Sequence, residues 1–232
     1  MGKTLRGAIA ALLALSAASA GATVVDFGSA QYDTSAFALS GNSADASSAA
    51  TPASALPLVS TATVVGANDF ATGSAIAAAG LLVATSEADS FAGALGGSAG
   101  AQAHLVSTIT GSGRLTLHFD FDSLDTLAGG PASGTLFVLL TNTLGTTTTT
   151  LLDRFFDVSA DTTLEFFLPG ATSVLDLVLF SSATTTGAGQ SAQNFAQVAV
   201  TGTVPTPDTL PLVAGGLVAA FVVRRRSSSR SA

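Results

Sequence analysis

The chain has 232 residues, of which 47% are hydrophobic and 10% are charged, and it contains no cysteine and no tryptophan. This hydrophobic share excludes a chain that is disordered for lack of apolar residues, and the length suits one sizeable domain or two small ones. The absence of cysteine excludes disulfides, a thiol nucleophile, a cysteine-bound metal and lipid attachment through cysteine.

Charge separates the middle of the chain from its two ends. Six of the eight basic residues lie within the first six or the last nine residues. Between Gly21 and Val204 two arginines stand against fourteen acidic residues, which gives this part a net charge of −12. Such a body repels phosphate backbones, so we expect no direct binding of nucleic acid.

Residues 1–20 have the three parts of a secretory signal peptide. Lys3 and Arg6 form a positive start, an uncharged apolar run follows, and the run ends in small residues at Ala18 and Ala20. The apolar run is too short to span a bilayer comfortably, and the alternative is an amphipathic or buried helix. We expect signal peptidase to cut here, so that the mature chain begins near Gly21 or Thr23.

The middle of the chain has the pattern of antiparallel strands. The clearest segment is Arg114–Asp122, where leucine and phenylalanine alternate with polar residues. Similar runs are separated by segments rich in glycine, proline and serine, which favour turns. The predicted strands, roughly nine in all, are Ala22–Phe27, Thr61–Val65, Leu81–Thr85, His104–Thr110, Arg114–Asp122, Thr135–Thr141, Thr162–Leu168, Val174–Ser181 and Phe195–Gly202.

These strands predict an all-β domain over residues 21–203, an antiparallel β-sandwich or jelly roll. Two segments are less clear, because the alanines of Ala71–Ala84 also suit a helix and Ser40–Ala55 looks the least ordered. The threonine run Thr146–Thr150 suits an edge strand or hairpin loop. Alternatively it accepts O-linked sugars, since the chain has no Asn-x-Ser/Thr sequon.

The body contains one motif that resembles a catalytic serine site. Gly96–Gly100 matches the G-x-S-x-G pattern of a nucleophile elbow, with Ser98 as the nucleophile. No acidic residue lies between Ser98 and His104 or His118, and no histidine follows His118. The order of residues that hydrolases of this class need is therefore not met, and a chance match is the better interpretation.

Acidic residues raise two further hypotheses. Asp120, Asp122 and Asp125 have a spacing at which carboxylates ligate calcium, although the first two equally suit a solvated strand face. His104 has no evident partner in the sequence, His118 lies on a polar face, and two histidines without cysteine do not suggest a transition-metal site. We expect no resident metal and no cofactor.

Three other acids, Asp153, Asp157 and Glu165, would supply carboxylates for glycosidase chemistry if the fold set a pair at the required separation. Sequence spacing does not give that separation. We therefore expect no catalytic residue in the body.

The last segment, residues 204–232, combines three features. Pro205, Thr206 and Pro207 form a rigid Pro-x-Pro unit, and fourteen uncharged residues follow at Leu210–Val223. As a helix those fourteen span about 21 Å, which is short for a bilayer core of about 30 Å. Arg224, Arg225 and Arg226 come next and place the following side in the cytoplasm.

This layout resembles the PEP-CTERM sorting signal, whose carriers are exosortase substrates in Gram-negative bacteria that make exopolysaccharide. The resemblance implies that Pro205, Thr206 and Pro207 are recognised by an exosortase-like enzyme. It also implies that Leu210–Val223 enters the membrane transiently and that Arg224, Arg225 and Arg226 act as the cytoplasmic stop. Thr206 departs from the family, which usually has glutamate there.

Together these features predict a non-enzymatic protein of the cell surface or extracellular matrix, exported through the inner membrane and processed at both ends. Its expected partners are signal peptidase, an exosortase-like enzyme, and exopolysaccharide or further copies of itself in a biofilm. The alternatives are a calcium-assisted carbohydrate-binding module and a single-pass membrane-anchored surface protein. A secreted hydrolase is a third, less favoured class.

Overall fold

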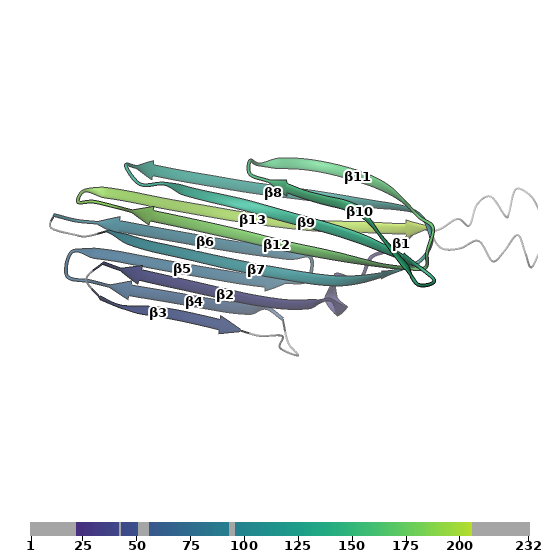
Figure 1. The fold of residues 1–232 in the computed structure, drawn as a ribbon, viewed down its shortest axis with the longest axis horizontal. Coiled ribbons are helices and arrows are strands. Elements are labelled where there is room, and N and C mark those ends of the chain that lie inside the picture. The colour runs from purple at the N-terminus through teal and green to yellow at the C-terminus, as the bar shows by residue number, and fades with distance from the viewer. Residues whose placement is uncertain (1–21, 42, 51–55, 93–95, 206–232) are drawn as a thin grey trace, which may run out of the picture.

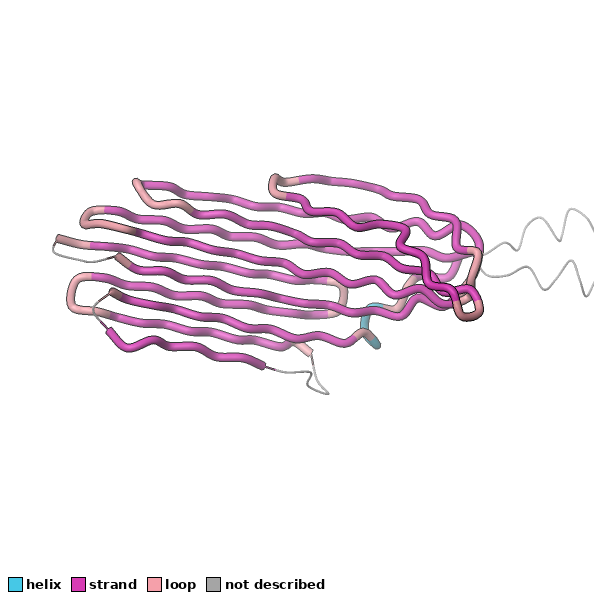
Figure 2. The backbone as a smooth tube through the Cα atoms, in the orientation of Figure 1, coloured by secondary structure: helices cyan, strands magenta, loops and turns pink. Residues whose placement is uncertain are grey.

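A computed structural model of the chain describes residues 22–41, 43–50, 56–92 and 96–205. Nearly all of this backbone is β-strand, and its helical structure is one turn of 3-10 helix, η1, at Phe27–Ser29 (Figure 2). No helix within these ranges is long and apolar enough to cross a bilayer. The strands share one long axis, and the body is drawn out along it (Figure 1).

The strands form two sheets, and every strand pair within them is antiparallel. Sheet A has the spatial order β11-β8-β13-β6-β5-β4, and β1 pairs with the end of β13. Its strands are β1 (Ala22–Val24), β4 (Leu58–Val65), β5 (Asp69–Ala78), β6 (Leu81–Ser90), β8 (Gly113–Ala128), β11 (Ala160–Leu168) and β13 (Gln190–Pro205).

Sheet B has the spatial order β10-β9-β12-β7-β2-β3 and packs face to face with sheet A. Its strands are β2 (Gln31–Ser40), β3 (Ser43–Ala50), β7 (Gly97–Thr110), β9 (Ala132–Leu144), β10 (Thr147–Phe156) and β12 (Thr172–Thr185). The prediction of an all-β, antiparallel domain is confirmed, and its two sheets are consistent with a β-sandwich.

One half of the sandwich has a core of large side chains. The inward residues of β8 alternate with polar outward residues as predicted, and Leu115, Leu117, Phe119 and Phe121 are all buried. Leucines of β9 and β12 face them from sheet B, and the whole set forms one continuous cluster. This burial of apolar area is the main stabilising term for the domain.

The other half has a core of small side chains. Its clusters consist almost entirely of alanine, such as Ala71 and Ala99 in one and Ala88 and Ala183 in another. Side-chain hydroxyls also meet between the sheets here. Ser86 Oγ lies 2.7 Å from Ser181 Oγ, and Ser90 Oγ lies 2.5 Å from Thr185 Oγ1, so these buried polar groups are hydrogen-bonded.

The fold decides three points that the sequence left open. Ala71–Ala84 is not helical, because it belongs to β5, a turn and β6. Ser40–Ala55 contains a full strand, β3, although residues 42 and 51–55 lie outside the described ranges. Thr147–Thr150 begins β10, which confirms that most of the threonine run lies in an edge strand.

The two ends of the described body meet. β1 pairs with the last residues of β13, with Ala22 opposite Pro205. Figure 1 shows the chain entering and leaving at this same end of the long axis. Of the predicted motif only Pro205 is described, as the last residue of β13. The predicted processing and stop residues Ala18, Ala20, Thr206, Pro207, Arg224, Arg225 and Arg226 lie outside the described residues.

Candidate functional site

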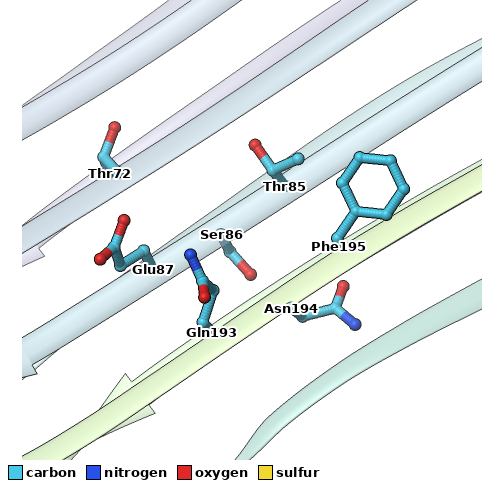
Figure 3. A pocket seen from close by; sticks show the side chains of 7 residues that line it. All are labelled: Thr72, Thr85, Ser86, Glu87, Gln193, Asn194 and Phe195. Carbon is cyan, nitrogen blue, oxygen red and sulfur yellow. The ribbon is translucent and has the colours of Figure 1, made fainter. Parts of the chain in front are cut away.

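The outer face of sheet A has a shallow hollow between β6 and β13 (Figure 3). Its volume is about 110 Å³. The hollow is small and open to solvent, so it can receive one side of a small ring but does not enclose it. Its lining residues are Thr72, Thr85, Ser86, Glu87, Gln193, Asn194 and Phe195.

Strand register brings these residues together from three separate parts of the sequence. Glu87 of β6 lies opposite Gln193 of β13, and Thr72 of β5 lies on its other side. One step along, Thr85 lies opposite Phe195. Because side chains alternate between the faces of a sheet, all five project outward, while the Ser86 and Asn194 side chains are buried between the sheets.

Phe195 supplies the apolar part of the hollow. Its side chain is 41% exposed, and the residue opposite it on β8 is Leu124, which is also exposed. An exposed aromatic ring of this kind presents a flat apolar surface that packs against the C–H face of a ring-shaped ligand.

Glu87 and the hydroxyls supply the polar part. Burial raises the pKa of Glu87, and the nearby Asp89 carboxylate raises that pKa further. Thr72 Oγ1 lies 2.9 Å from Thr63 Oγ1 and donates to the Ala62 carbonyl. The hollow therefore combines acceptor oxygens, the Gln193 amide and an aromatic ring, a set that suits a ligand with many hydroxyl groups.

Among the described residues, no lysine or arginine lines this hollow. Both arginines of the described residues are engaged elsewhere. Arg114 Nη2 lies 2.9 Å from Glu165 Oε2, and the Arg154 guanidinium lies 4.6 Å from the centre of the Phe156 ring. With the body at −12, the electrostatic field at the hollow disfavours anionic ligands.

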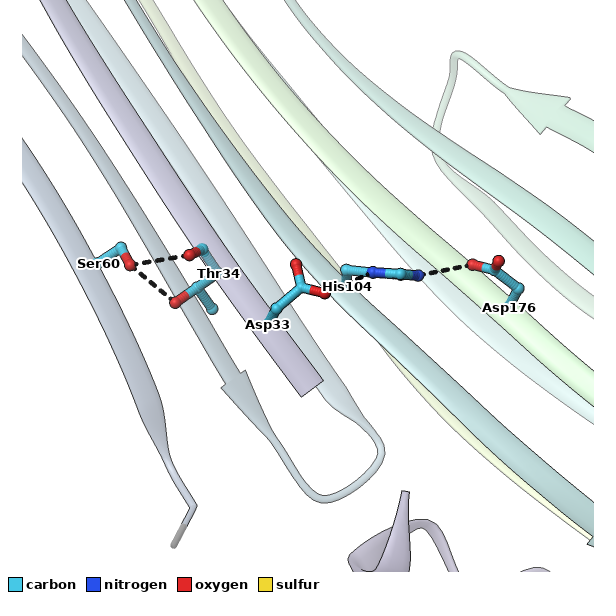
Figure 4. Close-up of polar contacts among 5 residues, drawn as sticks. All are labelled: Asp33, Thr34, Ser60, His104 and Asp176. Atoms are coloured by element: carbon cyan, nitrogen blue, oxygen red, sulfur yellow. Dashed lines mark hydrogen bonds and ion pairs between the residues drawn. The ribbon is translucent and has the colours of Figure 1, made fainter. Parts of the chain in front are cut away.

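A second polar group lies on the outer face of sheet B, where His104 sits between two carboxylates (Figure 4). His104 Nδ1 is 2.7 Å from Asp33 Oδ2, and Nε2 is 2.8 Å from Asp176 Oδ1. The imidazole ring therefore bridges two carboxylates that belong to different strands. The group joins β2, β7 and β12 side by side.

The expectation that His104 has no evident partner is wrong, because its ring contacts Asp33 and Asp176. Asp33 and Asp176 are 71 and 72 residues away along the chain. No local pattern signals such partners. Both ring nitrogens are engaged by carboxylates of neighbouring strands, so the group links β2, β7 and β12.

The three aspartates of the calcium hypothesis are divided between the two faces of β8. Asp122 projects outward, where its carboxylate accepts from Gln197 Nε2 at 3.2 Å, and Asp120 lies on the same face. Asp125 instead accepts from Asn194 Nδ2 at 2.5 Å on the inner side. Within the described part of the chain no three His, Asp or Glu side chains are arranged to hold a metal ion.

The possible catalytic residues are also placed apart. Ser98 lies inside strand β7, not at a strand-to-helix turn, and its hydroxyl is 3.3 Å from Thr184 Oγ1. Asp153 lies on β10 of sheet B, Asp157 follows that strand, and Glu165 lies on β11 of sheet A in its ion pair with Arg114.

His118, on the outer face of sheet A, has partners on β11. Its Nδ1 is 3.0 Å from Thr163 Oγ1, and its Nε2 is 3.4 Å from Asp161 Oδ1. The prediction that His118 lies on the polar face of its strand is confirmed, and its two contacts are those of a surface pair.

Comparisons with known proteins add little. No protein-family model matches the chain, and no curated protein matches it. One solved structure that matches is described as the structure of infectious bursal disease virus, Gx strain. Its identity is 11% and its TM-score 0.18, over 83% of this chain and 66% of that one, a likeness that carries no argument.

Proposed function

We propose that this chain is an exported, non-enzymatic protein of the cell surface or extracellular matrix, and that it binds neutral polysaccharide on the outer face of sheet A. The observation that carries the binding proposal is the hollow at Phe195, where an exposed ring lies beside the Glu87 carboxylate and the Gln193 amide. The N-terminal and C-terminal sequence features support the export proposal.

The chemistry of the hollow favours a neutral glycan over other polymers. Sugar rings have an apolar C–H face that packs on an aromatic ring, and their hydroxyls hydrogen-bond to carboxylate and amide side chains. A hollow of about 110 Å³ grips a single sugar weakly, so useful affinity comes from several contacts along a chain. Nucleic acids and acidic glycans are repelled by the net charge.

The proposed biological setting is the exopolysaccharide matrix around a Gram-negative cell. The chain resembles exosortase substrates of Gram-negative bacteria in its final segment, and such cells surround themselves with exopolysaccharide. A body that binds neutral glycan would hold this protein in that matrix or biofilm after signal peptidase and an exosortase-like enzyme have processed it. A single-pass anchored surface protein is the second candidate, favoured by the fourteen uncharged residues Leu210–Val223.

A comparison of two phenylalanines tests the binding proposal. Phe195 and Phe180 are both 41% exposed, on the outer faces of sheets A and B respectively. We expect Phe195→Ala to weaken retardation in native gels that contain a neutral glucan by about tenfold, or about 1.4 kcal/mol. Phe180→Ala is the matched control and should bind like the wild type.

A gel with a uronic-acid polysaccharide completes the test, because retardation there should be absent. The proposal fails if Phe195→Ala binds as well as the wild type, or if both alanine variants lose binding equally. It also fails if the acidic polysaccharide retards the protein more strongly than the neutral one.

A further inference from the structure

The two flanks of the sandwich differ in how their edge strands are protected. The flank formed by β3 and β4 is opposite the flank formed by β10 and β11. An edge strand presents a row of backbone N–H and C=O groups that pair readily with another strand. Proteins that stay monomeric usually block such edges with charges, prolines or bulges.

The β10 and β11 flank carries these protective features. The register of β10 against β9 shifts between Thr150 and Leu152, which marks a bulge. Most charged residues of the described body also lie on or beside this flank: Arg114, Asp120, Asp122, Asp125, Asp153, Arg154, Asp157, Asp161 and Glu165.

Strand β4 carries none of them. Its sequence, Leu58–Val65, contains no charge, no proline and no glycine, and it pairs with β5 in unbroken register. Its inward side chains are buried, and its outward ones are the exposed Val59, Thr61, Thr63 and Val65. The neighbouring strands also carry few charged residues: β5 contains one, the buried Asp69, and β3 contains one, Asp45.

We propose that two copies of this chain join edge to edge through β4, antiparallel about a two-fold axis, so that sheet A continues from one copy into the other. The occupant of the edge is a second copy because β4 offers what such a neighbour needs. Strand β4 is uncharged and rich in β-branched residues, and a flank poor in charge keeps the acidic groups of two bodies of net charge −12 away from the contact. An isologous contact of this kind closes at two copies.

The side-chain period fixes which face of one β4 strand continues which face of the other. Because a slip of one residue would turn buried side chains outward, Thr61 and Thr63 must lie opposite outward residues of the other copy. The contact would also place two hollows on one continuous outer face, where a long polymer could reach both. The pairing itself does not depend on polysaccharide binding.

Cysteine cross-linking tests the proposal directly, since the chain has no cysteine of its own. We expect the variant with Thr61→Cys and Thr63→Cys, in the form that a Gram-negative host accumulates, to give a disulfide-linked dimer on mild oxidation. The control has Thr148→Cys and Thr150→Cys on β10. Thr63 and Thr148 are matched, because each is an exposed edge threonine with a threonine hydroxyl partner, Thr72 at 2.9 Å and Thr143 at 3.1 Å.

A second variant keeps the test independent of oxidation. We expect the wild type to sediment as a dimer, the Thr63→Lys variant as a monomer and the Thr148→Lys variant as a dimer. Circular dichroism checks that both variants fold. The proposal is overturned if the wild type is monomeric at every soluble concentration, or if the β10 pair cross-links as well as the β4 pair. A wild-type protein that is monomeric at every soluble concentration and still binds polysaccharide would overturn this proposal and leave the proposed function standing.

Discussion

Glu87 lines the candidate site, and its charged carboxylate lowers the free energy of unfolding near neutral pH. Burial raises its pKa above the ordinary value of 4.5, and the adjacent Asp89 adds to that increase. The folded state therefore binds the Glu87 proton more readily than the unfolded state does. The resulting cost is absent in acid and appears as the pH rises through and above the ordinary pKa of the carboxyl.

Glu87→Gln should consequently stabilise the protein near neutral pH. We expect the free energy of unfolding to rise by about 0.5 kcal/mol or less at about pH 7, since the side chain is partly solvated, and to change little at about pH 3. Urea denaturation at the two pH values measures this. Glu165→Gln is the control, because it removes the ion pair with Arg114 and should not stabilise. A Glu87→Gln variant less stable than the wild type at neutral pH would contradict the argument.

Positions that depend on a single strand were predicted from the sequence, whereas contacts between distant strands were not. The polar, outward positions of Asp120, Asp122 and His118 were predicted, because each follows from alternation within one strand. The contacts of His104 were not, since they depend on the register of β2 and β12 against β7. The hollow at Phe195 was missed for the same reason, because its residues come from β5, β6 and β13.

At the scale of strands, the alanine-rich half of the sandwich brings the two sheets unusually close. A Cβ atom on Gly73 of β5 would lie 2.3 Å from the carbonyl oxygen of Gly100 on β7 and 2.9 Å from that of Phe37 on β2. Both neighbours are backbone atoms of the facing sheet, so neither moves out of the way easily. Glycine at position 73 is therefore needed for this spacing.

Gly73→Ala should separate the sheets locally and destabilise the domain. We expect a loss of about 3 kcal/mol in the free energy of unfolding, at the upper end of what overpacked cores show. Thermal or urea denaturation checks this. Gly187→Ala is the control, because a Cβ there meets nothing within 4 Å and its backbone has no left-handed conformation. Equal stability of the two variants would show that the sheets are not held this closely.

This half of the core also explains the strands that the sequence did not reveal. Strand β8 was predicted because large apolar residues alternate with charged ones. In β3 and β5 most residues are alanine, serine, glycine or threonine, so successive positions differ little in hydrophobicity. Alanine also favours helices, and the packing of the sheets overrides that preference in β5.

At the scale of the whole molecule, both ends of the body lie at the same end of the long axis. Ala22 and Pro205 are paired, two residues beyond the predicted first cleavage site and at the start of the Pro-x-Pro unit. Processing at either end would therefore take place beside the folded body without removing a core strand.

We expect the protein recovered from its host to begin near Gly21 and to end near Pro207. Pro205→Ala with Pro207→Ala should keep the C-terminal segment and hold the protein in the inner membrane, because the rigid motif is lost. Intact mass and cell fractionation measure both. Pro131→Ala, in the turn between β8 and β9, is the control and should be processed normally. A wild-type protein that retains Leu210–Ala232 would contradict the sorting proposal and favour a permanent anchor.

Strand β13 ends at this shared end, and its position decides how the body responds to pulling. Its 16 residues span about 53 Å and lie between β8 and β6, with β1 paired to the last three. A force applied beyond Pro205 therefore acts along the strand and loads hydrogen bonds on both sides in shear at once. Were this end to tether the protein in a flowing matrix, the body would resist mechanical unfolding through one of its two longest strands, which lies in the interior of sheet A.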